Sequence, residues 1–217
     1  MRSTRRGCDT ARMGFYREHI LPRAVDRACG TKDLQRWRAE VTEGLSGTLV
    51  EIGFGSGLNV PVYPAEVTEV YAVEPAMTAR RLSEGRVADS HVDVHHIGLR
   101  GEEIPLDDDS CDGALSTFTL CTIPDVEQAL SEVRRVLRPG GRFHFLEHGA
   151  APDASVRKWQ HRIEPIQKVV ADGCHLTRDA AQLVQDAGFD LETVESRYGQ
   201  GPKPWSWFTE GAAVNPG

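Results

Sequence analysis

A glycine-rich loop that follows a short β-rich run is the first feature of the sequence that could do chemistry. The run covers residues 48–52, and the loop, residues 53–57, reads Gly-Phe-Gly-Ser-Gly. Glycines at this spacing let the backbone approach a ligand more closely than any Cβ would allow. A dinucleotide fold requires GxGxxG with pyrophosphate at the helix N-terminus. Here the third glycine comes one residue early and Glu51 precedes the loop, so the pattern favours a ligand with an ammonium group and no phosphate.

Two further segments complete a predicted nucleoside site. Glu74 ends the next β-rich run, where its carboxylate can accept two hydrogen bonds from a ribose diol. The turn at Gly101-Glu102 follows a third run, and its backbone amides and side chain could read an adenine edge. The full set of predicted cofactor-binding residues is Glu51, Gly53, Phe54, Gly55, Ser56, Gly57, Glu74, Pro75, Gly101, Glu102 and Thr117.

An α/β framework must hold these residues, and the sequence predicts one. The order of β-rich runs and helical patterns implies a parallel sheet that is covered by helices on both faces. Two more runs at the end of the chain alternate like antiparallel strands. The expected fold is therefore a Rossmann-like seven-stranded, mostly parallel sheet with an antiparallel C-terminal strand. The predicted strands are 48–52, 67–73, 92–97, 113–119, 142–147, 190–196 and 205–213.

The predicted helices have recognisable ends. A helix over 16–29 contains Pro22, which predicts a kink, and a second helix covers 32–44. Apolar residues at helical spacing predict a third helix over 126–137, which ends at a Pro-Gly-Gly turn. A fourth helix is expected over 177–187, with Thr177 as its N-cap and Gly188 just past its end.

Four motifs, taken in order, resemble the class I S-adenosylmethionine-dependent methyltransferases over residues 45–213. The loop at 51–57 is similar to the family's cofactor loop, and Glu74 to its ribose acid. Residues 112–115, Asp-Gly-Ala-Leu, look like its fourth strand, and residues 137–141, Leu-Arg-Pro-Gly-Gly, recur across its small-molecule branch. The resemblance implies S-adenosylmethionine as the cofactor and S-adenosylhomocysteine as the product.

The length of the chain and the absence of internal repeats favour one domain, which is expected to be a methyltransferase domain over residues 1–217. Within it, residues 1–45 are expected to form an N-terminal helical cover and residues 46–150 the cofactor-binding core. Residues 151–217 are expected to form an acceptor-side segment and a C-terminal hairpin.

A narrower set of motifs resembles the methyltransferase-like alkyl thiol methyltransferases. The matching segments are residues 120–123, 137–141, 147–148 and 172–178. That family methylates small lipophilic thiols and hydrogen sulfide, so a thiol is the first acceptor that the resemblance implies. Its animal members begin with a membrane-anchoring segment, which this chain is expected to lack, and they commonly carry Asn where this sequence has His175.

Methyl transfer from a sulfonium is an in-line displacement, so the donor methyl and the acceptor lone pair must be close and collinear in a dry pocket. A thiol has an ordinary pKa of about 8.5, so a modest lowering of that pKa is enough to form the thiolate. An alcohol or a phenol has a clearer need for a general base. His148 follows the last parallel run, and His175 and Asp172 belong to a segment that could fold over the same edge. These three residues are the predicted catalytic groups, and the chemistry requires no metal.

The composition limits the partners and the location. The chain of 217 residues is 40% apolar and 26% charged, and its net charge of -7 disfavours a nucleic-acid partner. The five cysteines have no CxxC pair and are expected to be reduced thiols. No apolar stretch approaches the roughly 20 residues of a membrane span, and no signal-peptide pattern is present. The sequence therefore predicts a cytoplasmic protein without an integral membrane span.

Several alternatives stay open at this point. The small-molecule acceptor could be a phenol, quinone or lipid headgroup, methylated on oxygen or nitrogen, because related loops serve all of these. No Asn-Pro-Pro-Tyr occurs, which disfavours methylation of a nucleic-acid base. A nicotinamide-dependent oxidoreductase is disfavoured by the early third glycine and by Glu51. A cofactor-binding module without catalysis would retain the same motifs, and only turnover distinguishes it. The sequence predicts no particular oligomeric state.

Overall fold

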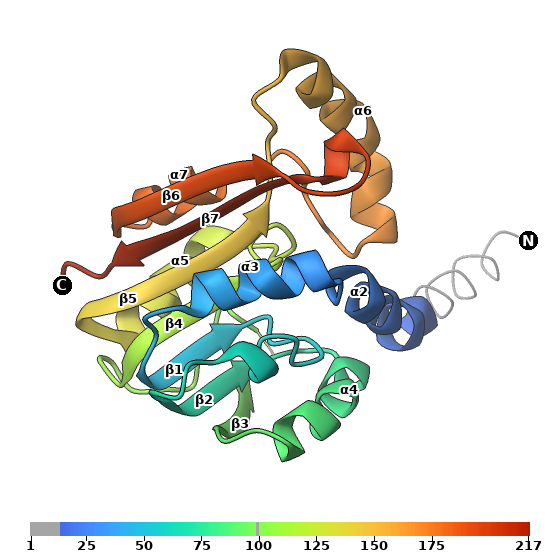
Figure 1. The fold of residues 1–217 in the computed structure, drawn as a ribbon. Helices are drawn as coiled ribbons and strands as arrows, with labels where there is room; N and C mark the ends of the chain where they lie inside the picture. The colour runs from blue at the N-terminus through green and yellow to red at the C-terminus, as the bar shows by residue number, and fades with distance from the viewer. Residues whose placement is uncertain (1–13, 99) are drawn as a thin grey trace, which may run out of the picture.

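The computed structural model describes residues 14–98 and 100–217 of the chain (Figure 1). The basic residues 1–6 and Cys8 lie outside the described part. Seven strands form one sheet, β1 (Gly47–Ile52), β2 (Val67–Val73), β3 (Asp93–Gly98), β4 (Cys111–Thr117), β5 (Leu137–His148), β6 (Asp190–Tyr198) and β7 (Trp207–Val214).

The strands lie in the order β3-β2-β1-β4-β5-β7-β6. Strands β1 to β5 are parallel to one another, whereas β7 runs antiparallel to both of its neighbours, β5 and β6. The predicted Rossmann-like sheet, with seven mostly parallel strands and an antiparallel C-terminal strand, is confirmed. The connections run outward from β1 in both directions, which places the topological switch point at the carboxyl ends of β1 and β4. Ligands of open α/β sheets bind at this point, and we call the space above it the crevice.

Helices and short helical turns surround the sheet. They are η1 (Tyr16–Ile20), α2 (Leu21–Cys29), α3 (Lys32–Thr42), η2 (Val60–Val62), α4 (Met77–Ala88), α5 (Val126–Val136), α6 (Ala154–Val170), α7 (Ala180–Asp186) and η3 (Lys203–Trp205).

Two apolar clusters explain why both faces of the sheet are covered. On one face, Leu130 of α5 and Val184 of α7 pack in a cluster with Phe143 of β5. On the other face, Val41 of α3 packs in a second cluster with Leu49 of β1. Parallel strands with apolar side chains on both faces need this double cover to remove those side chains from water.

The helix predicted over 16–29 forms as two segments. Residues 16–20 are a π-helix, η1, and the α-helix α2 begins at Leu21 with Pro22 in its first turn. Proline has no N–H to donate to the preceding turn, and the wider π-helical turn before it accommodates this loss. The expected kink at Pro22 therefore takes the form of a change of helix type.

The predicted N-cap of the last helix is wrong. α7 begins at Ala180, and Asp179 caps it by accepting a hydrogen bond from the backbone N–H of Gln182 at 3.1 Å. Thr177 does not cap the helix because its N–H and its hydroxyl both donate to Glu164 of α6, at 2.9 and 2.6 Å. Gly188 lies just past the helix with φ +88°, as predicted for a helix that ends in a left-handed residue.

Several predicted boundaries also shift. The Pro-Gly-Gly segment was expected to precede the fifth strand, but β5 already begins at Leu137, which pairs with Cys111. The register then shifts, and Arg142 pairs with Gly113. β4 ends at Thr117 rather than at residue 119, because Phe118 adopts a φ of +57° that stops the extended backbone.

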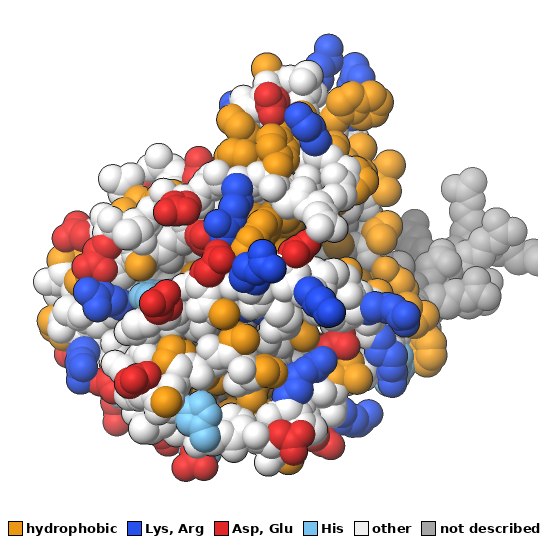
Figure 2. All heavy atoms as spheres, viewed as in Figure 1, with side chains coloured by type: hydrophobic (Ala, Val, Ile, Leu, Met, Phe, Trp, Pro, Cys, Tyr) orange, Lys and Arg blue, Asp and Glu red, His pale blue; other side chains and the backbone are white. Residues whose placement is uncertain are grey.

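The 17-residue helix α6 lies beyond one end of the sheet (Figure 1). The sequence predicted only an acceptor-side segment there, without a helix. Hydrophobic side chains gather on the outer surface of this helix (Figure 2), among them Trp159, Ile166, Val169 and Val170, which are all exposed. Within residues 14–98 and 100–217, none of the helices combines the length and the apolar character that crossing a membrane requires.

Candidate active site

The glycine loop after β1 uses its three glycines for different purposes. All three have positive φ, +68° at Gly53, +59° at Gly55 and +73° at Gly57. A Cβ on Gly53 would overlap the side chain of Thr119, and one on Gly57 would lie 3.0 Å from the Cβ of Ser83. A Cβ on Gly55 would meet no atom closer than 3.7 Å. Gly53 and Gly57 therefore allow neighbouring side chains to pack closely against the loop. At Gly55 the side of the backbone that a Cβ would occupy is open, so a ligand can approach it there.

Glu74 joins the glycine loop to the end of β2. Its Oε2 accepts a hydrogen bond from the backbone N–H of Gly55 at 2.8 Å, and its Oε1 accepts one from Ala76 at 2.7 Å. The residue is only 8% exposed, and burial raises the pKa of its carboxyl although both hydrogen bonds act in the opposite direction. Each carboxylate oxygen has a second lone pair, so the fixed group can still accept a pair of hydroxyls.

A buried polar network lies under the crevice. Glu51 is 1% exposed, and its carboxylate accepts hydrogen bonds from Asn59, at 2.8 Å, and from the hydroxyl of Tyr63. The hydroxyl of Thr117 accepts hydrogen bonds from Arg38, at 2.6 Å, and from Asn59, at 3.0 Å. Burial raises the pKa of the Glu51 carboxyl to about 7. Glu51 and Thr117, which the sequence analysis assigned to cofactor binding, thus form hydrogen bonds with other side chains of the protein.

Sequence reasoning missed Arg38, Asn59 and Tyr63 as members of this network. The sequence could have indicated Arg38 by its position on α3, because it lies three residues before the buried Val41 and therefore on the same face of the helix. An arginine on the inward face of a helix needs buried acceptors, because an unpaired buried charge is costly.

The other predicted loop residues face the protein as well. Phe54 packs edge-on against His96, with 5.4 Å between the ring centroids. The Ser56 hydroxyl donates to Asp26 of α2 at 2.6 Å, and Arg86 of α4 forms an ion pair with the same carboxylate at 3.0 Å. Arg86 also donates to the backbone carbonyl of Ser56 at 2.7 Å, so helices α2 and α4 both hold the glycine loop. Pro75, beyond Glu74, is exposed at the rim of the crevice.

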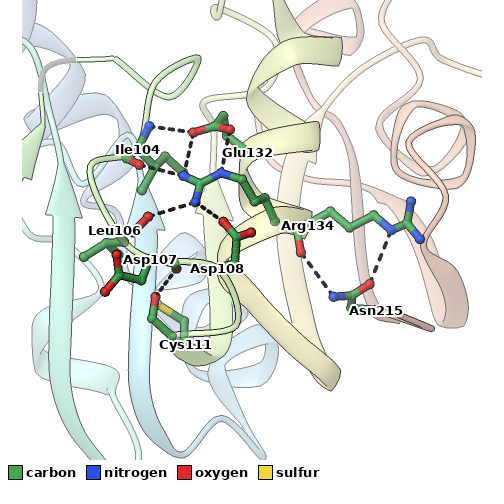
Figure 3. Close-up of polar contacts among 10 residues, drawn as sticks. Ile104, Leu106, Asp107, Asp108, Cys111, Glu132, Arg134 and Asn215 are labelled. Atoms are coloured by element: carbon green, nitrogen blue, oxygen red, sulfur yellow. Dashed lines mark hydrogen bonds and ion pairs between the residues drawn. The ribbon is translucent and has the colours of Figure 1, made fainter.

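The predicted adenine turn is fixed by two residues of α5 (Figure 3). Glu132 accepts a hydrogen bond from the backbone N–H of Ile104 at 3.0 Å. Arg135 donates to the carbonyls of Ile104 and Leu106, each at 2.8 Å, and to Asp108 at 2.7 Å. These contacts hold the chain that follows the turn. Within the turn, Gly101 is buried and Glu102 is half-buried.

On the acceptor side, the structure brings His148 together with two cysteines. The Sγ of Cys174 lies 3.2 Å from His148 Nε2 and 3.8 Å from the Sγ of Cys121. The cysteines come from the loop after β4 and from the segment after α6, whereas His148 ends β5. The hydrogen bond to Cys121, together with burial, raises the pKa of the Cys174 thiol. The sequence predicted only reduced thiols for both cysteines, because their wide spacing gives no signal of a shared site.

The other two predicted catalytic residues have different partners. The carboxylate of Asp172 forms an ion pair with Arg17 of η1 at 2.9 Å, and both side chains are about half exposed. His175 Nδ1 lies 3.9 Å from Glu164 of α6, and burial lowers the pKa of its imidazole. Their roles in catalysis stay predictions.

Glu147 is a residue of this edge that the sequence did not select. It is fully buried, and its Oε1 accepts hydrogen bonds from Ser116, at 2.9 Å, and from the N–H groups of Thr119 and Leu120, at 2.9 and 3.0 Å. The sequence could have indicated Glu147, because it is a charged residue within the otherwise apolar end of β5. Its contacts order the loop that carries Cys121.

Comparison with known proteins identifies the class to which this fold and crevice belong. A family profile described as a methyltransferase domain matches residues 50–145. The rat thiol S-methyltransferase TMT1B is 34% identical over 187 residues, which cover 84% of this chain and 72% of the relative. The human thiol S-methyltransferase TMT1A is 32% identical over 162 residues, which cover 73% of this chain and 65% of the relative.

Solved structures share the fold at low sequence identity. Phosphoethanolamine N-methyltransferase 2 of Haemonchus contortus, in complex with phosphomonomethylethanolamine and S-adenosylhomocysteine, has a TM-score of 0.69 at 15% identity, covering 94% of this chain and 60% of that one. A geranyl diphosphate methyltransferase in complex with S-adenosylmethionine has a TM-score of 0.64 at 15% identity, covering 84% of each chain. This chain belongs to the class I S-adenosylmethionine-dependent methyltransferases, in the family that includes the thiol S-methyltransferases TMT1A and TMT1B.

The protein is thus a methyltransferase that uses S-adenosylmethionine. The crevice fits this cofactor in two respects. Gly55 leaves an open side of the loop backbone, and Glu74 offers a fixed carboxylate with free lone pairs at the end of β2.

Proposed function

We propose that the protein transfers the methyl group of S-adenosylmethionine to a small, apolar thiol. The observation that carries this proposal is the 34% identity to a relative named as a thiol S-methyltransferase, which extends over 84% of this chain. A match over 84% of the chain extends beyond the cofactor-binding core expected at residues 46–150, so it supports a similar acceptor as well as a similar cofactor.

Bound S-adenosylmethionine would supply a methyl group on a sulfonium, with S-adenosylhomocysteine as the leaving group when the acceptor sulfur attacks the methyl carbon from the opposite side. The chain's own task is to hold the acceptor in line and to keep water away. In this proposal the loop residues 53–57, Glu74 and the turn at 101–102 bind the cofactor. Glu51 and Thr117 contribute through the network under the loop.

The acceptor side is formed by the residues around the carboxyl end of β5. His148 is the group best placed to take a proton from an acceptor thiol, because it ends β5 at the edge where the crevice opens. Asp172 holds the segment after α6 against η1 through Arg17, which helps to close this side. His175 follows Cys174 in the same segment. The expected cytoplasmic location stays a prediction.

A panel of acceptors tests the proposal. Purified protein is supplied with S-adenosylmethionine and, separately, with an alkyl thiol, a thiophenol, a phenol and an amine, and S-adenosylhomocysteine and methylated products are quantified. The proposal predicts thioether from both thiols. Product from the phenol or the amine alone would retain the cofactor and replace the acceptor, and binding without turnover of any acceptor would favour a non-catalytic module.

A further inference from the structure

Three potential metal ligands meet at the acceptor side. Among the described residues, Cys121, His148 and Cys174 offer two sulfurs and one imidazole nitrogen, which all lie within 4.8 Å of one another. The sulfurs of the two cysteines are 3.8 Å apart, and Cys174 Sγ is 3.2 Å from His148 Nε2. Cys121 and Cys174 are buried, while His148 is half-buried, so the cluster is reached from the side of the histidine.

Two of these separations are close to those around a tetrahedral zinc ion. Zinc binds sulfur at about 2.3 Å and imidazole nitrogen at about 2.0–2.1 Å, so its ligands lie about 3.8 Å apart for two sulfurs and about 3.5 Å apart for sulfur and nitrogen. The observed sulfur pair agrees with the first value, and the sulfur–nitrogen pair lies slightly inside the second.

Three contacts order the two segments that carry the cysteines. The backbone N–H of His175 donates to the carbonyl of Cys121 at 2.8 Å, which joins the two cysteine-bearing segments. Gly173, with φ +92°, forms the turn before Cys174, and a Cβ there would approach the carbonyl of Thr122 to 3.3 Å. Arg178 donates to the carbonyl of Ile123 at 2.8 Å and fixes the same loop. A site that is preorganised in this way loses little entropy when it binds an ion.

We infer that Cys121, His148 and Cys174 bind a soft divalent cation, for which zinc is the natural probe. Thiolate and imidazole ligands select zinc over the hard cations calcium and magnesium. The sequence predicted no metal, because cysteines and a histidine separated by more than twenty residues carry no spacing signal. Only the fold brings them together.

A fourth ligand position then follows from the geometry. A tetrahedral ion with three protein ligands keeps one position for water or for a bound molecule. We assign this fourth position to the acceptor thiol, an assignment that rests on the proposed function. In this arrangement the His148 imidazole is a ligand of the ion and does not act as the base, so the thiol gives its proton to solvent and binds the metal through its sulfur. Its lone pair then forms the bond to the methyl group as the sulfonium carbon–sulfur bond breaks, and the neutral thioether leaves as a weak ligand.

Cobalt titration tests the metal site without measuring activity. The protein is reduced, stripped with a chelator and titrated with Co²⁺ in the absence of oxygen, while the thiolate-to-cobalt absorption band is followed. The inference predicts a band that saturates at one cobalt per chain, is displaced by zinc, and is lost in Cys174→Ala and Cys121→Ala. Cys111→Ala, a buried cysteine at the opposite end of β4, retains the band. A band that persists in both cluster variants, or no band in the wild type, overturns the inference.

Two checks separate the possible failures. Binding of S-adenosylmethionine by each variant shows that it is folded, so that loss of the band reports the ligands. Thiophenol added to the cobalt-loaded protein shifts the band, whereas phenol leaves it unchanged. If the band shifts but no thioether forms, the metal site stands and the proposed function fails. If the metal-free protein forms thioether at the full rate, the proposed function stands and the role of the fourth position fails.

Discussion

Gly55 and Glu74 are joined by a hydrogen bond of 2.8 Å, from the backbone N–H of the glycine to the carboxylate. This bond connects the loop after β1 to the end of β2, and therefore the two segments that a nucleoside with a charged tail must touch. The carboxylate holds the loop in shape and presents its remaining lone pairs to the crevice. Both tasks depend on the same side chain.

Removal of that carboxylate is expected to weaken cofactor binding. Glu74→Ala loses the predicted contacts with the ribose and frees the N–H of Gly55, so the affinity for S-adenosylmethionine falls by about ten- to a hundredfold, or about 1.5–3 kcal/mol. Isothermal titration calorimetry measures the change. Glu84→Ala removes the same charge from an exposed position of α4 and serves as the control. Equal affinities for the Glu74 variant and the wild type would contradict the ribose assignment.

The two loop glycines Gly53 and Gly55 make a matched comparison. Both have positive φ, so an alanine at either position has the same kind of backbone strain. Only at Gly53 does the new Cβ overlap a neighbour, Thr119. Gly53→Ala is therefore expected to lower the free energy of unfolding by about 1–3 kcal/mol more than Gly55→Ala does. Urea denaturation of both variants measures the difference, and equal losses would contradict the packing described for the loop.

Much of this arrangement could be predicted from the sequence. Buried strands read as continuous apolar runs, and a glycine loop and an acid at the ends of two such runs must meet at one edge of a parallel sheet. The rest depends on contacts between distant segments. Thr177 looks like a helix cap until Glu164 of another helix takes its hydroxyl. Cys121 and Cys174 carry no local signal, because only the turn after α6 brings them together.

The Glu51 carboxyl makes stability depend on pH. Its pKa lies at about 7 in the folded protein, against an ordinary value of 4.5. A raised pKa of an acid means that the folded state binds the proton more tightly, so the contribution to stability is complete below pH 4.5 and is lost as the pH rises through 7. Glu51→Gln does not titrate at this position, so its stability lacks this pH-dependent loss. The stability of the wild type relative to the variant should therefore fall by about 3 kcal/mol between pH 4.5 and 8.

Urea denaturation across that pH range measures the difference. Glu43→Gln changes an exposed carboxyl and should follow the wild type at every pH. If Glu51→Gln shows the same pH dependence as the wild type, Glu51 is not the group that titrates near neutrality.

The anchor between α5 and the adenine turn can be tested by removing its guanidinium. Arg135→Leu keeps an apolar side chain as far as Cδ but loses the hydrogen bonds to Ile104, Leu106 and Asp108. We expect faster amide hydrogen exchange over residues 101–107 and a several-fold weaker affinity for S-adenosylmethionine, because the turn must be ordered on binding. Arg81→Leu, on the exposed part of α4, is the control. Unchanged exchange in the turn would show that other contacts fix it.

Acceptor-side variants should separate turnover from cofactor binding. His148→Ala and His175→Ala are expected to keep their affinity for S-adenosylmethionine and to lower turnover, His148→Ala by about a hundredfold or more if it moves the proton. His91→Ala, at an exposed histidine before β3, should retain both properties. Steady-state kinetics and calorimetry on the same preparations measure the two effects. Full turnover in both variants would remove these histidines from the acceptor site.

The most direct measurement of the central claim is a competition between two acceptors that differ in one atom. Thiophenol and phenol are supplied together in equal amounts with S-adenosylmethionine that carries a labelled methyl group, and the labelled products are separated by mass spectrometry. The account predicts labelled methyl phenyl sulfide in step with S-adenosylhomocysteine, and loss of both in Glu74→Ala. Labelled anisole as the main product would contradict thiol methylation while leaving the methyltransferase assignment in place.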